Sequence, residues 1–304
     1  MDSYEILCID DGSTDTTPTI LRQYAQQYDK IQILTQPHSG LSAALNWGLI
    51  NARGKFIWFV DSDDFIRKNC LSKIYDIAQK IDIEELEISY LAFVDSGGII
   101  PVRNECELTY QCEAKCKSVH AAWQAWIRRS FLIENHIRFD VNMVYGIDIL
   151  FQYFVYQAST MGKHVKVNPP VYFYRRHSNS LMGNRSVENM TRHTKDLIYM
   201  AQKYQQVLSN GMILSVEKQD NTRRRVNLAT LGALTILPDS DLNPHEILQS
   251  LKNEKLYPLP FMGWHVLDTK GVKGKIIESI KLLFSWEMFY WIYYYFRKKL
   301  PKRR

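Results

Sequence analysis

Gly54-Lys55-Phe56-Ile57-Trp58-Phe59-Val60-Asp61-Ser62-Asp63-Asp64 is the stretch that decides the fold of this 304-residue chain. Residues 56–60 form a continuous run of apolar and β-branched side chains, which is typical of a strand covered on both faces. Three carboxylates follow, and they cannot continue into the core because unpaired buried charges are very unfavourable. We therefore expect a buried strand that delivers these carboxylates to the carboxyl edge of a sheet, where open α/β sheets bind ligands.

Carboxylates gathered at one edge of a sheet need a cation between them. Hard oxygen ligands favour Mg²⁺ or Mn²⁺, commonly shared with the phosphates of a substrate. The residues 61–64 therefore predict a metal and phosphate site. The alternative is a solvated acidic loop that caps the following helix, which is expected to begin near Asn69. Asp64 fits either reading, as a metal ligand or as the cap of that helix.

Composition and charge are those of a folded protein that contains no membrane span. Hydrophobic residues make up 46% of the chain and charged residues 23%, with a formal net charge of +6. Residues 1–20 are rich in acidic side chains and do not have the basic and then apolar start of a signal peptide. No run of apolar residues is long enough to span a bilayer. Much of the net positive charge lies in residues 297–304, at one end of the sequence, which argues against a nucleic-acid partner.

The five cysteines are an odd number in a chain with no visible secretion signal. This pattern is typical of reduced thiols in the cytosol, so we expect a cytoplasmic protein without a disulfide framework. Cys112, Cys116 and His120 recur every four residues and would share one face of a helix, which offers a zinc site as an alternative. The absence of a paired Cys-x-x-Cys motif favours packing of the cysteines as small hydrophobic residues.

The first part of the chain alternates predicted strands and helices. Strands are expected at residues 4–9 and 31–34, and an amphipathic helix at residues 41–52 leads to the strand at 56–60. The order strand, helix, strand, helix, strand is that of a parallel, right-handed sheet. We expect an α/β fold with a mixed, mostly parallel sheet flanked by helices.

Four motifs in this part carry a family resemblance. They are Asp10-Asp-Gly-Ser-Thr-Asp15, Gly40-Leu-Ser-Ala-Ala-Leu-Asn-Trp-Gly48, Gly54-Lys-Phe56 and Asp61-Ser-Asp-Asp64. Their order and spacing resemble those of the family 2 glycosyltransferases. The resemblance implies an inverting transferase of the hexosyltransferase type with a GT-A, Rossmann-like fold, which uses a nucleotide-diphosphate sugar, with UDP as the expected nucleotide. It also implies polysaccharide biosynthesis and a metal-binding Asp-x-Asp motif.

The resemblance continues as far as about residue 182. Residues 122–132, 137–139 and 145–148 are similar to the acceptor half of small capsule and lipopolysaccharide transferases in that family. There a Glu-Asp pair stands at the start of a helix, and its Asp is the catalytic base. This sequence has Ile147 at the Glu position and keeps Asp148, whose alternative role is that of a carboxylate favoured by the helix dipole. The expected domain 1–182 thus divides into a nucleotide-sugar half, 1–100, and an acceptor half, 101–182.

The resemblance also implies roles for individual residues. Asp63 is expected to be the direct metal ligand, with Asp61 nearer the ribose and a metal-bound water. Asp11 is expected to accept hydrogen bonds from the base or ribose, or else to bond its own turn, with Asp10 in the structural role. The expected nucleotide-sugar site is made of Asp10, Asp11, Asp61, Ser62, Arg175 and His177. Arg176 is a further candidate for the diphosphate, because guanidinium groups pair well with phosphate.

One departure from the family pattern concerns the first element. The family normally begins with a strand and helix that line the base pocket, whereas this chain starts at the strand that would come second. A βα unit of about 20–30 residues would be missing. Its absence from a parallel sheet would leave an edge unpaired. The alternative to an active enzyme is therefore a catalytically impaired remnant that acts as a structural or interaction protein.

The last third of the chain, 183–304, is expected to be helical. Helices are predicted at residues 192–208, 217–237 and 244–251 by their periodicity. Residues 276–304 are rich in Trp, Tyr and Phe and end in a basic cluster. An aromatic helix with basic residues at its end suits the interface of a membrane, and the alternative is a helix packed on its own domain. A lipid-linked or cell-surface glycan acceptor at the cytoplasmic face of a bacterial membrane would agree with such a contact.

Overall fold

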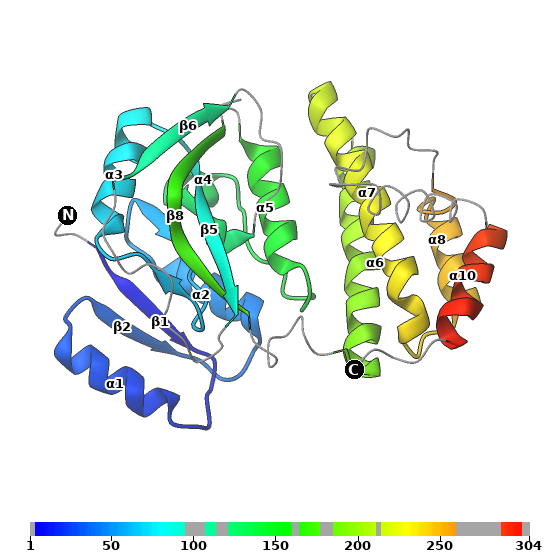
Figure 1. The fold of residues 1–304 in the computed structure, drawn as a ribbon, viewed down its shortest axis with the longest axis horizontal. Helices are drawn as coiled ribbons and strands as arrows, with labels where there is room; N and C mark the ends of the chain where they lie inside the picture. Colours follow the sequence, from blue (N-terminus) through cyan, green and yellow to red (C-terminus); the bar gives the residue numbers. More distant parts are fainter. Residues whose placement is uncertain are drawn as a thin grey trace. The chain divides into compact units, whose positions relative to one another are not determined.

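The computed structural model describes residues 4–94, 107–113, 121–159, 164–176, 185–210, 214–259 and 287–299. The chain divides into two compact units, Met1–Ser180 and Leu181–Arg304. The first unit contains every described strand, and the second unit is helical where it is described (Figure 1).

The strands of the first unit form two sheets. The larger sheet has the order β3-β7-β5-β8-β4, with β6 paired to β8, and the smaller one consists of β1 and β2. The strands are β1 (Ile6–Asp10), β2 (Ile31–Thr35), β3 (Phe56–Trp58), β4 (Phe65–Ile66), β5 (Glu85–Val94), β6 (Thr109–Glu113), β7 (Ala125–Arg128) and β8 (His164–Arg176).

The mixed α/β fold is confirmed, but the prediction that the sheet is mostly parallel is wrong for the described pairs. Only β1–β2 and β5–β8 are parallel, whereas β3–β7, β5–β7, β4–β8 and β6–β8 are antiparallel. The reason is the insertion of β7 between β3 and β5. Those two strands run in the same direction, as the strand and helix order predicts, but each has the reversed β7 as its neighbour.

β1 and β3 are both edge strands among the described residues. β1 pairs with β2 along one edge, and β3 pairs with β7 along one edge. No strand in the described part of the chain pairs with the other edge of either.

The strand expected at 56–60 is covered on both faces, as its apolar run predicts. Ile57 and Phe59 pack in one hydrophobic cluster with α4 (Arg129–Glu134) and α5 (Ile147–Ala158). Phe56 and Trp58 pack against a second cluster, which is built with α3 (Cys70–Ile81). In Figure 1, α3 and α5 lie on opposite sides of β5 and β8. The regular strand ends at Trp58, so residues 59–64 lead out of the sheet.

The smaller sheet is joined to two helices that the sequence also predicts. α1 (Thr17–Gln27) connects β1 to β2, and α2 (Leu41–Asn51) follows β2. Gly48 of α2 faces the Ile9 side chain, to which an added Cβ would lie at 3.4 Å. A short 3-10 helix, η1 (Ala122–Gln124), precedes β7.

The second unit contains the helices α6 (Val187–Ser209), α7 (Val216–Ile236), η3 (Leu237–Asp239), α8 (Pro244–Asn253) and α10 (Glu287–Lys299). Figure 1 shows α6 and α7 side by side. The predicted helices in this region are confirmed, although α6 begins earlier than expected. Ser186 caps α6 by accepting a hydrogen bond from the amide of Asn189, and this cap lies upstream of the apolar periodicity. Among the described residues, no helix combines the length and apolar character needed to cross a bilayer.

Candidate active site

The acidic loop after β3 is held in place by β8. The Tyr172 hydroxyl donates a hydrogen bond to Asp64 Oδ2 at 2.6 Å and accepts one from the backbone amide of Asp61 at 3.1 Å. The backbone amide of Arg175 donates to Asp64 Oδ1 at 2.7 Å. Both oxygens of Asp64 are therefore engaged by β8, and the loop is fixed from both of its ends.

The helix-capping alternative for Asp64 is wrong. The N-cap residue of α3 is Asn69, which is in the left-handed conformation and makes no side-chain cap hydrogen bond. Asp64 instead serves as the acceptor that fixes the loop to β8. Tertiary hydrogen bonds thus take the place of the expected local cap, because the partners of Asp64 are more than 100 residues away in the sequence.

The Tyr172 hydroxyl stays protonated while it donates its hydrogen bond to Asp64. Burial, followed by the charge of Asp61, raises the pKa of Tyr172. Burial also raises the pKa of Asp64, against the lowering effect of the hydrogen bonds from Tyr172 and Arg175. The phenol therefore remains the donor of this hydrogen bond across the ordinary pH range.

The charges of carboxylates from two separate elements act on Asp61. Burial raises the pKa of Asp61 to about 7, and the charges of Asp64, Asp63 and Asp148 add to this effect. Asp63 and Asp64 belong to the same loop, whereas Asp148 comes from α5. The sequence prediction that Asp148 lies at the start of a helix is confirmed, and its charge acts on the Asp-x-Asp loop.

Asp148 lies in the first turn of α5, after Gly146 as the N-cap residue. Burial raises the pKa of Asp148, and hydrogen bonds from the backbone amides of Ile149 and Asp148 itself act against this. Its neighbour Ile147 is buried in the core. The position at which the family resemblance expects a Glu is therefore a packing position in this chain.

Asp11 is the centre of a separate hydrogen-bond network. Its carboxylate accepts hydrogen bonds from the Gln36 side chain at 2.6 Å and from the backbone amides of Ser39 and Gly40, each at 2.9 Å. The ring of His38 lies 2.9 Å from the same carboxylate. Burial acts to raise the pKa of Asp11, but the hydrogen bonds from Gln36, Ser39 and Gly40 prevail and lower it.

Asp10 has the structural role that the sequence predicts for it. It is buried, and its carboxylate accepts a hydrogen bond from the backbone amide of Ser13 at 2.9 Å. The alternative in which Asp11 bonds its own turn is wrong, and its contact with the base or ribose stays a prediction. Asp11 binds backbone groups, but those of the loop before α2 and not those of its own turn.

Two glycines near Asp11 have left-handed backbones. Gly12 has φ of 77°, and a Cβ added there would lie 2.9 Å from the backbone nitrogen of His38. Gly40, the N-cap residue of α2, has φ of 89°, and a Cβ added there would meet nothing within 4 Å. The turn at Gly12 and the loop before α2 therefore lie in close backbone contact.

The remaining predicted binding residues are placed as follows. Ser62 is exposed on the acidic loop, and Arg176 is exposed at the end of β8. The guanidinium of Arg175 lies 4.9 Å from the centre of the Phe65 ring, next to the loop that its own amide holds. His177 lies outside the described residues. So do Cys116 and His120 of the zinc alternative, whereas Cys112 is described and exposed.

The donor set suits a dication that also binds substrate phosphates. Among the described residues, no group of three or more His, Cys, Asp or Glu side chains has the arrangement of a complete metal site. Mg²⁺ is commonly bound by only one or two carboxylates, with phosphate oxygens and water as its other ligands. Asp63 and Asp61 are two such carboxylates. Burial, followed by the charges of Asp64, Asp63 and Asp148, raises the pKa of Asp61, and a bound cation would favour its charged form.

Sequence reasoning missed Tyr172 as a site residue. Tyr172 lies within the stretch that carries the family resemblance, but the sequence analysis assigned it no role. A signal was available, because a Tyr within an apolar strand is buried and a buried hydroxyl needs a partner. Gln36 was also missed, and its position in a Pro- and Gly-containing loop gave no comparable signal.

Known proteins with similar sequences are glycosyltransferases or take part in teichoic acid biosynthesis. Residues 1–84 match the sequence model described as Glycosyl transferase family 2. The chain is 30% identical over 196 residues to the putative glycosyltransferase EpsH of Bacillus subtilis (strain 168), which covers 60% of this chain and 55% of that protein. It is also 30% identical over 201 residues to the minor teichoic acid biosynthesis protein GgaA of the same strain, covering 64% of this chain and 45% of that protein. The chain thus spans about half the length of these relatives.

Solved structures show the same fold. The chain is similar to S. aureus TarS 1–349 in complex with UDP-GlcNAc, with a TM-score of 0.62 and 15% sequence identity. The similarity covers 98% of this chain and 84% of that one. TarS 1–349 alone gives a TM-score of 0.61 at 16% identity. Residues 1–84 are thus similar to glycosyl transferase family 2, and the fold of the chain is similar to that of TarS 1–349.

Proposed function

We propose that the chain is an inverting glycosyltransferase that moves a sugar from a UDP-sugar to a hydroxyl group of a glycan acceptor. The observation that carries the proposal is the approach of Asp148 on α5 to the Asp-x-Asp loop, seen in the combined effect of their charges on Asp61. This arrangement supplies a base and a phosphate-facing acidic loop in one place. The solved complexes of TarS with UDP and UDP-GlcNAc support a UDP-sugar as the donor class.

Asp148 is the general base in this proposal. The acceptor oxygen forms a bond to the anomeric carbon from the face opposite the diphosphate. The bond from that carbon to the diphosphate breaks, its electron pair leaves with the diphosphate, and the proton of the acceptor hydroxyl passes to the Asp148 carboxylate. Burial of Asp148 suits this step, because a raised pKa makes a carboxylate a stronger base.

The donor is held by the loop and by the end of β8. Asp63, together with Asp61, would hold Mg²⁺ or Mn²⁺, which supplies Lewis-acid stabilisation of the departing diphosphate. Ser62 and Asp61 face the donor, and Arg175 and His177 remain the proposed cationic contacts of the diphosphate. Asp11 acts in part through the loop 36–40, whose backbone it orders next to the proposed nucleotide site.

We propose a lipid-linked or cell-surface glycan as the acceptor, and a peripheral position of the enzyme on the cytoplasmic face of the membrane through residues 276–304. The relatives support the acceptor class, because GgaA is described as a minor teichoic acid biosynthesis protein. Of residues 276–304, the structure describes Glu287–Lys299, which form α10.

Calorimetric titration with UDP, with and without Mn²⁺, tests the donor site. The protein should bind UDP more tightly with Mn²⁺, and Asp63→Ala should lose that gain. Asp76→Ala is the matched control, since Asp76 is an exposed carboxylate on α3. Equal UDP affinity with and without Mn²⁺ would contradict the metal-assisted site. A panel of UDP-sugars, followed by release of UDP, then identifies the donor.

The alternative function is that of a protein which keeps the fold without turnover. Failure of UDP to bind to the wild-type protein under any metal condition would support this alternative. Metal-dependent binding with release of UDP from a UDP-sugar would exclude it.

A further inference from the structure

The helix α10 is fixed to its own unit by one face. Tyr290 and Tyr294 are buried on that face. The Tyr293 hydroxyl donates to the carbonyl oxygen of Thr235 at 2.8 Å, and Arg297 forms an ion pair with Asp239 at 3.0 Å. These contacts join α10 to the end of α7 and to η3.

The opposite face of α10 is apolar and exposed. Its large side chains have exposed fractions of 58 to 64%, and they are Met288 (62%), Ile292 (60%), Tyr295 (58%) and Phe296 (64%). Their spacing of four, three and one residues places them on one side of a helix. We call these four residues the α10 stripe. A surface helix normally turns its apolar stripe toward the core and a polar face toward solvent. The helix α10 instead presents this apolar stripe to solvent in addition to the face that it buries.

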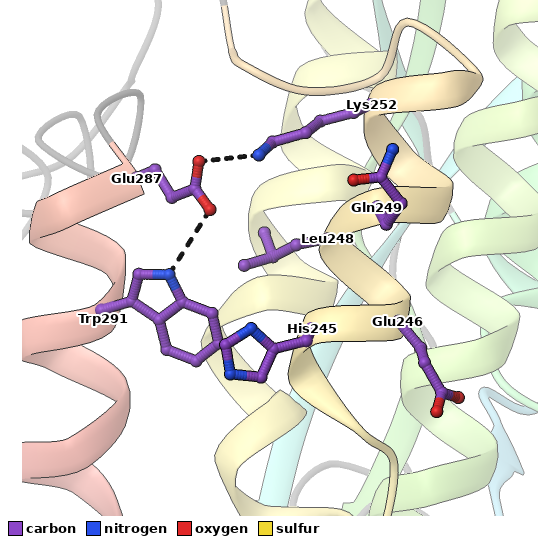
Figure 2. Close-up of a pocket in the computed structure, with 7 residues that line it drawn as sticks. All are labelled: His245, Glu246, Leu248, Gln249, Lys252, Glu287 and Trp291. Atoms are coloured by element: carbon purple, nitrogen blue, oxygen red, sulfur yellow. Dashed lines mark hydrogen bonds and ion pairs between the residues drawn. The ribbon is translucent and has the colours of Figure 1, made fainter.

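Two contacts with α8 add to those that hold α10 in this orientation. Lys252 of α8 forms an ion pair with Glu287 at 2.7 Å, and the rings of His245 and Trp291 lie 4.2 Å apart (Figure 2). These residues line a cavity of about 360 Å³ between the two helices. Figure 2 shows the polar ends of Glu287 and Lys252 pointing toward each other across it.

Positive charge is concentrated at one end of the stripe. Lys298 and Lys299 are exposed in the last turn of α10, next to Arg297. Lys299 follows Tyr295 by four residues, so it continues the line of the stripe. The sequence adds Lys302, Arg303 and Arg304. Long basic side chains can keep their charge at the phosphates while their carbon chains lie along apolar groups.

We propose that the α10 stripe is a docking surface for an anionic lipid bilayer. Apolar and aromatic side chains enter the boundary between headgroups and acyl chains, and the basic residues pair with anionic headgroups. The juxtaposition of an exposed apolar stripe with a basic end favours this occupant over a protein, whose interface core is usually depleted of Lys. The inference deepens the proposed membrane contact, but its test does not depend on sugar transfer.

Vesicle flotation tests the inference directly. The full chain is mixed with vesicles of phosphatidylcholine, either alone or with phosphatidylglycerol. It should float with the mixed vesicles and be released by high salt. Ile292→Glu/Phe296→Glu should weaken this binding about tenfold or more, since two large apolar groups leave the interface. Val216→Glu/Leu228→Glu is the matched control, because both residues are exposed apolar residues of α7 in the same unit.

Two further measurements complete the test. Lys298→Gln/Lys299→Gln should reduce binding to the mixed vesicles and leave the apolar stripe unchanged. Calorimetric binding of UDP should be the same in all variants, which separates this inference from the proposed donor site. Flotation that is equal in wild-type protein and the Glu variant would overturn the proposal. So would a wild-type dimer that ignores vesicles and becomes a monomer in the Glu variant.

Discussion

The carboxylate of Asp61 is unfavourable in its charged form, since its pKa rises from 3.8 to about 7 in the folded protein. A carboxyl group with a raised folded-state pKa contributes most stability when it is protonated, and this contribution is lost as the pH rises from about 4 through about 7. At pH 8, Asp61→Asn should therefore be more stable than the wild type by about 1 to 3 kcal/mol. At pH 3 the two proteins should unfold alike.

Urea unfolding at both pH values measures the effect of Asp61→Asn. Asp76→Asn is the control for removing a carboxylate in the same unit, and it should show no pH-dependent gain. Mn²⁺ should reduce the difference in the free energy of unfolding between Asp61→Asn and the wild type at pH 8, because a cation favours the charged form of Asp61. A variant that is less stable than the wild type at pH 8 would contradict the charge accumulation described for this loop.

A second prediction concerns the proposed general base, Asp148. Asp148→Asn keeps the size and much of the hydrogen bonding of the side chain but removes its ability to take a proton. Sugar transfer should fall by about 10² to 10⁴-fold, the usual contribution of a general base. Binding of UDP with Mn²⁺ should remain, since the Asp-x-Asp loop is intact. Unchanged turnover, measured as release of UDP, would refute the assignment of Asp148 as the base.

Among the elements, β8 controls the acidic loop through Tyr172. Tyr172→Phe removes the donor to Asp64 and the acceptor for the Asp61 amide, and it changes nothing else in the size of the core. We expect a loss of about 1 to 2 kcal/mol in the free energy of unfolding. We also expect UDP to bind about tenfold more weakly in the presence of Mn²⁺, because the loop is no longer fixed. Tyr110→Phe on β6 is the control, and equal effects of both changes would argue against a specific role of β8.

The loop before α2 depends in a similar way on β1. Asp11→Ala leaves the backbone amides of Ser39 and Gly40 without their acceptor. Hydrogen exchange at these two amides should become faster, and the protein should lose about 1 to 3 kcal/mol of stability. Asp15→Ala is the control, because Asp15 accepts only an exposed local bond from Thr17. Unchanged exchange at residues 39 and 40 would exclude Asp11 as the organiser of this loop.

For the whole molecule, the division into two units predicts which segments a bound nucleotide protects from hydrogen exchange. UDP with Mn²⁺ should slow hydrogen exchange in residues 36–40, 61–64 and 172–176 of the first unit. α6 and α7 should exchange at unchanged rates, because each unit packs its own set of elements. Asp63→Ala under the same conditions is the control and should show no protection. Protection confined to α6 and α7 would place the nucleotide site elsewhere.

The sequence predicts the local elements of this molecule better than their pairing. The apolar run at 56–60 and the carboxylates after it identify a covered strand and its acidic exit, because burial and charge act locally. The reversal of β7 between β3 and β5 was not predicted, since the direction of a neighbouring strand depends on residues about 70 positions away. The hydrogen bond from Tyr172 to Asp64 was not predicted either, because the two residues are 108 positions apart in the sequence. The approach of Asp148 was expected only through the family resemblance.

The two left-handed glycines next to Asp11 differ in how they should tolerate substitution. In a library that places every amino acid at each position, position 12 should accept no other residue, because any Cβ would collide with the His38 backbone. Position 40 has open space around it, so only its backbone conformation is restrictive. Asn, which enters the left-handed region more readily than other residues, should be the most frequent survivor there. Sequencing of the surviving variants at these two positions would therefore report how closely the backbone packs around β1.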